Sequence, residues 1–182
     1  MRTLSEHILD IVQNSIGAKA TLIEIIVEED KKIDLCSLII KDNGCGMSRE
    51  TLAKATNPFF TSRTTRKVGL GLPLLKQNAE AAGGIFSIES EENVGTVLKA
   101  TFQLSNIDKP PLGDIWETLY LLFLSYENGE LIYRHKTEKG EFSLSSEELK
   151  EALGGVSYQL KEIREGILEL IKTNIEEIEA KK

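Results

Sequence analysis

The chain has 182 residues, and 22 Lys and Arg against 29 Asp and Glu give a net charge of −7. This length suits one domain with or without an extension, and 41% apolar and 28% charged residues are ordinary values for a globular protein. The longest apolar run, residues 120–124, is far shorter than the roughly 20 residues that cross a membrane, and the first ten residues lack the apolar core of a signal peptide. We therefore expect a cytoplasmic protein that does not bind a membrane. Its acidic balance also argues against a nucleic-acid partner.

Charge is distributed unevenly along the chain. Residues 1–106 have a net charge of −1, whereas residues 107–182 have a net charge of −6. The change coincides with Pro110-Pro111, a pair that neither a helix nor a central strand accommodates. We predict an N-terminal domain over residues 1–106 and a C-terminal extension over residues 107–182.

The N-terminal part alternates helical and strand patterns. Apolar residues at spacings of three and four predict a helix over 3–18, and a second helix follows over 71–82 with Pro73 in its first turn. Ser48 is the expected cap of a short helix between them. Alternating apolar residues predict strands over 21–29, 35–42, 85–90 and 96–104. This order predicts an α/β sandwich with helices on one face of a sheet.

The opening helix carries a polar stripe. Asp10 and Asn14 are four residues apart and are therefore neighbours on one face. A carboxylate can orient a water molecule, and an amide oxygen can bind a hard cation such as Mg²⁺. The alternative is a polar face that simply meets solvent.

The segment Asp-Asn-Gly-Cys-Gly-Met (42–47) directly follows an apolar strand. Asp42 at the strand end can accept a hydrogen bond from the amino group of a heterocycle, and Gly44 and Gly46 let the backbone approach a flat ligand. The alternative is an ordinary tight turn, because Asn-Gly is a common turn pair.

Two further segments favour an anion. Residues 61–67 hold four hydroxyls and three cations, Arg63, Arg66 and Lys67, which suit a polyphosphate as well as a solvated loop. Gly69, Leu70 and Gly71 precede the second long helix, where free N–H groups bind anions. Glycines at such a place also serve ordinary turns.

In this order the segments resemble the motifs of the GHKL ATPases, which include gyrase B, the heat-shock chaperone ATPases, histidine kinases and the MutL proteins. Residues 10–21 are similar to their N box, residues 42–47 to their adenine motif, and residues 57–63 to the histidine-kinase F box. Residues 69–90 resemble the second glycine motif with its helix and strand, and residues 95–104 resemble the closing Gly-Thr strand. The resemblance covers about residues 3–105.

The resemblance implies the Bergerat fold, a mixed sheet backed by helices, with ATP as the ligand and Mg²⁺ as its metal. It implies that Asn14 binds Mg²⁺, that Asp42 accepts from the adenine amino group, that Gly44 and Gly46 line the adenine pocket and that Thr96 supports Asp42. It implies phosphate contacts for Gly69, Leu70 and Gly71, and γ-phosphate contacts among the cations Arg63, Arg66 and Lys67.

Departures from the family pattern bear on activity. Asp10 stands where gyrase-type members have a Glu base and many histidine kinases have Asn, and Lys67 stands where many kinases begin a longer glycine motif. Few residues precede the N box, so we expect no phosphoacceptor hairpin before it and not a complete sensor kinase. His7 is interpreted as a structural residue. Two functions compete: slow ATP hydrolysis or phosphotransfer to a protein with Asp10 as base, and an ATP-gated switch with little catalysis.

The extension is predicted to be mostly helical. Helices are expected over 114–125, 145–155 and 157–179, and residues 130–135 and 141–144 can pair as a hairpin. The apolar stripe of the last helix suits a partner protein, a homodimer or this domain's own surface. His135 in the hairpin is interpreted as a surface residue or a phosphoacceptor.

Overall fold

The protein forms one mixed sheet of six strands in the order β3-β4-β2-β1-β5-β6. The computed structural model describes residues 1–57, 70–126 and 128–180. The strands are β1 (Leu22–Asp30), β2 (Leu35–Asp42), β3 (Phe86–Glu91), β4 (Gly95–Gln103), β5 (Glu130–Thr137) and β6 (Gly140–Ser145). All neighbouring strands are antiparallel except β1 and β5, which are parallel.

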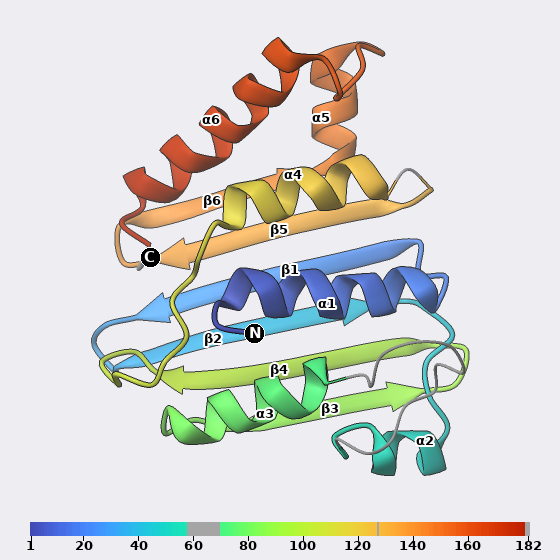
Figure 1. The fold of residues 1–182 in the computed structure, drawn as a ribbon, viewed down its shortest axis with the longest axis vertical. Coiled ribbons are helices and arrows are strands. Elements are labelled where there is room, and N and C mark those ends of the chain that lie inside the picture. Colours follow the sequence, from blue (N-terminus) through green and yellow to red (C-terminus); the bar gives the residue numbers. More distant parts are fainter. Residues whose placement is uncertain (58–69, 127, 181–182) are drawn as a thin grey trace.

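Helices cover one face of this sheet (Figure 1). They are α1 (Leu4–Gly17), α2 (Arg49–Lys54), α3 (Gly71–Ala81), α4 (Ile115–Ser125), α5 (Ser146–Leu153) and α6 (Lys161–Glu177). Side chains alternate along β1, where Ile23, Ile25 and Val27 are fully buried toward the helices. The predicted α/β class and its single helical layer are therefore confirmed, because period-two strands bury only one face.

The extension continues the same sheet. Residues 130–137 and 140–145 form the predicted hairpin, and its first strand lies beside β1 with Ile25 opposite Tyr133. Helix α4 lies beside α1, and α6 packs against α4 with its C-terminal end near the β5–β6 turn (Figure 1). The apolar stripe of α6 packs on the protein's own core through Ile167, Ile171 and Ile175. No helix among the described residues is long and apolar enough to span a membrane.

His135 does not lie on the surface. It is completely buried on β5, its Nε2 lies 3.0 Å from Glu29 Oε1 on β1, and its Nδ1 lies 2.8 Å from the Tyr133 hydroxyl. The surface interpretation of this histidine is therefore wrong, because the hairpin joins the sheet and makes β5 an inner strand.

Candidate functional site

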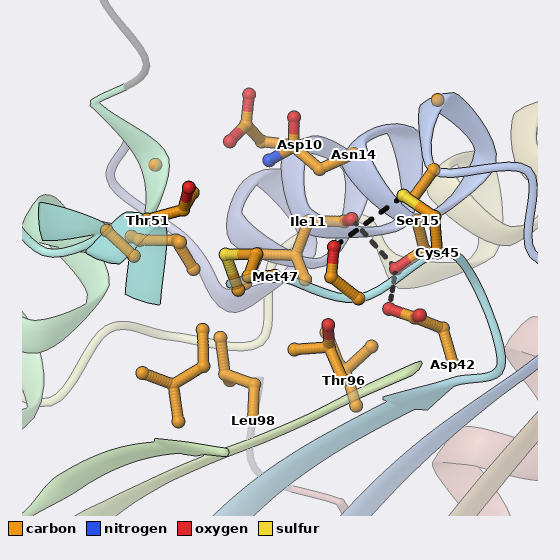
Figure 2. A pocket seen from close by; sticks show the side chains of 18 of the residues that line it. Asp10, Ile11, Asn14, Ser15, Asp42, Cys45, Met47, Thr51, Thr96 and Leu98 are labelled. Carbon is orange, nitrogen blue, oxygen red and sulfur yellow. Dashed lines mark hydrogen bonds between the residues drawn. The ribbon is translucent and has the colours of Figure 1, made fainter. Parts of the chain in front are cut away.

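A cavity of about 600 Å³ lies between α1, the start of α3 and the sheet, with the segment after β2 and α2 along its side (Figure 2). Its wall contains six of the residues singled out from the sequence, which are Asp10, Asn14, Asp42, Gly46, Gly71 and Thr96. They come from two helices, two strands and a loop, so the fold brings together residues that are far apart in the chain.

Asp42 marks one end of the cavity. It is the last residue of β2, and Ser15 of α1 donates a hydrogen bond of 2.7 Å from its hydroxyl to Asp42 Oδ2 (Figure 2). The Gly44 N–H donates to the other oxygen, Oδ1, at 2.9 Å. The two bonds hold the carboxylate in a fixed orientation. A carboxylate has about four acceptor positions, so it retains the capacity to accept from a ligand.

The residues between Asp42 and the cavity have structural tasks. Asn43 Oδ1 accepts from the N–H groups of Thr21 and Leu22, which holds the start of β1 against the end of β2. Gly44 is buried against Ala18, where a Cβ on residue 44 would lie 2.9 Å from the Ala18 Cβ. The structure thus places Gly44 behind the cavity wall and not among the residues that line it.

Gly46 does line the cavity, and its backbone requires glycine. Its φ is +62°, and a Cβ there would come within 1.9 Å of the Glu91 carbonyl oxygen. Only a residue without a side chain adopts this conformation so close to another backbone. The loop is therefore pressed flat against the end of β3.

Thr96 lies beside Asp42 on the neighbouring strand. The two residues are register partners in β2 and β4, and the Thr96 hydroxyl points toward the cavity (Figure 2). Its Oγ1 is 2.9 Å from Ser90 Oγ on β3. The wall at this end of the cavity therefore combines the side-chain oxygen atoms of Asp42 and Thr96 with apolar side chains such as Leu98.

Asp10 and Asn14 form the other polar group. They project from adjacent turns of α1, away from Asp42 and Thr96 (Figure 2). Among the described residues, no cluster of three or more His, Cys, Asp or Glu could hold a metal by itself. A cation here would share its shell with water and ligand oxygens, as Mg²⁺ commonly does.

The N-terminus of α3 meets Asp10. A Cβ on Gly71, the first residue of α3, would lie 1.8 Å from Asp10 Oδ2, so glycine permits this approach. Leu70 is the N-cap residue, is 43% exposed and does not line the cavity. Arg63, Arg66, Lys67 and Gly69 lie outside the described residues.

His7 is a buried residue of α1 that faces α3. Asn78 Nδ2 of α3 lies 2.9 Å from His7 Nε2, and burial lowers the pKa of His7 to about 4. The imidazole is therefore neutral near pH 7, its Nε2 accepts from the amide, and Nδ1 carries the proton. The interpretation of His7 as a structural residue agrees with this position.

Three polar side chains that line or support the cavity wall gave no functional signal in the sequence: Ser15, Ser90 and Tyr126. Tyr126 donates to the Ala20 carbonyl at 2.6 Å, and its pKa is raised first by burial and then by the charge of Asp42. Each of these residues acts through a partner far away in the chain, and a lone Ser or Tyr gives no signal of such pairing. The one available hint was that Ser15 lies next to Asn14.

The arrangement has a definite chemical capacity. One end of the cavity offers hydrogen-bond acceptors to a flat group with an amino substituent. The other end offers an amide, a carboxylate and a helix N-terminus, which suit a metal-bound anion. One ligand with both features would satisfy both ends.

Comparison with known proteins gives a family and a fold. Residues 2–106 match the family described as "Histidine kinase-, DNA gyrase B-, and HSP90-like ATPase". The sensor histidine kinase YvrG of Bacillus subtilis is 33% identical in a match that covers 51% of this chain and 17% of the relative. The heme sensor protein HssS of Staphylococcus saprophyticus is 30% identical in a match that covers 56% of this chain and 22% of the relative.

A solved structure, the N-terminal domain of a DNA repair protein, superimposes with a TM-score of 0.53 at 18% identity. The match covers 79% of this chain and 52% of that one, and it extends the likeness of fold beyond the matched family region.

Proposed function

Because the chain belongs to the histidine kinase-, DNA gyrase B- and HSP90-like ATPase family, we propose that its cavity binds ATP as the magnesium complex and turns it over slowly. Membership of this family implies an ATP site of the histidine-kinase kind. This chain spans less than a quarter of the length of these sensor relatives, so their activity does not transfer to it directly. Magnesium as the metal, ATP turnover and the product of that turnover are therefore part of the proposal.

The observation that carries the proposal is the division of one cavity into two chemically different ends. Asp42 and Thr96 form the end that suits the adenine amino group, and Asp10, Asn14 and Gly71 form the end that suits phosphates and a cation. Asn14 would supply one oxygen to Mg²⁺, and the ion would neutralise phosphate charge when bound.

Asp10 is the proposed general base. Its carboxylate lies on the cavity wall against the N-terminus of α3, where an attacking water or acceptor hydroxyl would need to lose a proton. The side chain is one methylene shorter than Glu, so a bridging water would complete the reach at some loss of positioning. This predicts turnover that is slow but dependent on the carboxylate.

The proposal includes a protein that accepts the γ-phosphate, and only the similarity to kinases supports this part. It also includes a homodimer. Arg63, Arg66 and Lys67 remain candidates for γ-phosphate contacts.

The direct test of turnover compares the wild type with Asp10→Asn at saturating Mg·ATP. We expect phosphate release or protein labelling from γ-labelled ATP to fall about 100-fold, because general bases typically contribute 10²–10⁴-fold. Glu6→Gln, an exposed change on the same helix outside the cavity, is the matched control. Equal rates in the wild type and Asp10→Asn would remove the base role from Asp10.

The metal role has its own test. We expect Asn14→Ala to shift the magnesium dependence of ATP binding to higher concentration, while circular dichroism shows an intact fold. If the magnesium titration curves of Asn14→Ala and the wild type superimpose, Asn14 does not bind the metal and is only a polar residue on the helix surface.

A second function, an ATP-gated switch, is favoured by the path from the cavity to the extension. Helix α1 carries Asp10 and Asn14, and α4 of the extension packs directly against it. The Leu4 and Ser5 N–H groups also bind the carbonyls of Pro111 and Leu112 at 2.9 and 3.0 Å. Bound ATP with no turnover, together with protease protection of residues 107–182, would favour this function over catalysis.

A further inference from the structure

Ser90 lies behind the cavity wall and has a complete set of partners. It is on β3 opposite Thr96 in the strand register. Its Oγ accepts from the Met47 N–H at 2.9 Å and donates to the Gly95 carbonyl at 2.9 Å. The third neighbour of this oxygen is Thr96 Oγ1, also at 2.9 Å.

These three contacts favour one direction for the Thr96 proton. A serine hydroxyl has one proton to donate and two lone pairs that accept. All three contacts are satisfied together only when the proton goes to Gly95, the Met47 N–H takes one lone pair and the remaining lone pair accepts from Thr96. The Thr96 hydroxyl has then donated its own proton away from the cavity, and its lone pairs are left to face the ligand.

We propose that Ser90 is a specificity-determining positioning residue, which makes Thr96 an acceptor toward the cavity, next to the acceptor Asp42. This inference rests on the proposed ATP site and adds to it the reason for base selection. With two acceptors side by side, this end of the cavity takes a purine edge with an amino group, directly or through a water. A purine with a carbonyl oxygen at the same position finds no donor there.

ATP and ITP distinguish these cases, because they differ in having an amino group or a carbonyl oxygen at purine position 6. A carbonyl oxygen that loses its water without gaining a donor is strongly disfavoured. If Ser90 is replaced by alanine, the Thr96 hydroxyl can rotate and donate to that oxygen. ITP binding then improves relative to ATP.

The experiment measures the dissociation constants of ATP and ITP for the full chain by equilibrium titration with magnesium. In Ser90→Ala we expect the preference for ATP over ITP to fall about 3- to 10-fold, the range of one ordinary hydrogen bond. Ser90→Thr keeps the hydroxyl and should keep the wild-type preference for ATP. A merely structural role of residue 90 does not predict this difference between the two variants. Ser90→Cys, with a weakly bonding thiol of similar size, gives the same test if the alanine variant fails to fold.

A double-mutant cycle with Thr96→Val shows whether Ser90 acts through Thr96. In the Thr96→Val background, we expect Ser90→Ala to leave the ATP-to-ITP ratio unchanged, because the hydroxyl that it orients is gone. An unchanged ratio in a folded Ser90→Ala single variant would overturn the inference while leaving the ATP site in place. A wild type that binds neither nucleotide would overturn the proposed function itself, and this inference with it.

Discussion

Single residues in this protein act mainly through short polar contacts between segments that are far apart in the chain. Ser15 orients Asp42, Ser90 orients Thr96, and Asn78 binds His7 across two helices. Each contact fixes one functional group of the cavity wall or one helix that carries such a group. Their common feature is that the acting residue is neutral and small, so it adds direction without adding charge.

His7 gives a prediction about pH. Its pKa of about 4 in the folded protein lies below the 6.5 of an ordinary histidine, so the unfolded chain binds the extra proton first. The contribution to stability is therefore complete above pH 6.5 and is lost as the pH falls toward 4. By linkage, this residue alone should lower the free energy of unfolding by about 2 to 3 kcal/mol across that window.

Urea unfolding of the wild type and His7→Gln between pH 4 and 7 measures this effect. Glutamine does not titrate, so its stability should fall less steeply on acidification. Parallel pH profiles for the two proteins would show that His7 titrates at its ordinary pKa and that the burial penalty is absent.

At this scale, the sequence revealed charged and conformationally special residues better than their supports. Asp10, Asn14, Asp42, Gly46 and Thr96 all line the cavity as the motifs suggested. Gly44 instead packs behind the wall, because a glycine in a turn looks the same in sequence whether it serves a ligand or a neighbouring helix. Ser15 and Ser90 depend on strand and helix pairing that a linear pattern does not contain.

The helices and strands that form the site depend on the close approach of α1 and α3. At Gly71 the first turn of α3 nearly touches the Asp10 carboxylate, so the relative position of these helices sets the distance between a proposed base and a proposed phosphate site. This contact makes the start of α3 sensitive to even one added methyl group.

Gly71→Ala tests that sensitivity. The new Cβ would fall 1.8 Å from Asp10 Oδ2, so we expect the carboxylate or α3 to move and phosphate release to fall about 10-fold or more. Gly166→Ala in α6 is the matched control, because a Cβ there meets nothing within 4 Å and should only raise stability, by about 1 kcal/mol. Wild-type turnover in Gly71→Ala would show that this contact is unimportant for the reaction.

The elements themselves were largely readable from the sequence, because periodicity and capping are local. Ser48 caps α2 by accepting from the Thr51 N–H at 3.2 Å, and Ser145 forms a capping box with Glu148 at the start of α5. The stripe on the last helix was less informative. Ile171 is fully buried, whereas Leu160 and Leu170 remain about half exposed, since the spacing marks a face but not how far the core extends beneath it.

At the scale of the whole molecule, the extension and the family region share one sheet. The parallel pair β1–β5 joins them, and the buried Glu29–His135 contact crosses that pair. The pairing could not be predicted, because it joins strands separated by about a hundred residues and neither strand carries a local signal for its neighbour. The predicted boundary between residues 106 and 107 remains a prediction about folding units.

A fragment of residues 1–110 tests this boundary. We expect it to fold, because the cavity residues all precede the cut, but to unfold at lower urea concentration than the full chain. Its loss would come from the exposed edge of β1 and from the face of α1 that α4 covers in the full chain. An unchanged midpoint would establish an independent domain, and an aggregated fragment would establish a single shared core.

The measurement that tests the central claim most directly is an equilibrium titration of the wild type, Asp42→Asn and Asp108→Asn with Mg·ATP. The first change removes the cavity carboxylate that we propose accepts from the adenine amino group, and the second makes the same replacement on the exposed linker. We predict that Asp42→Asn weakens ATP binding about 10- to 150-fold, equivalent to a charged hydrogen bond of about 1.5–3 kcal/mol, and that Asp108→Asn binds like the wild type. Wild-type ATP affinity in a folded Asp42→Asn protein would contradict the assignment of this cavity as the nucleotide site.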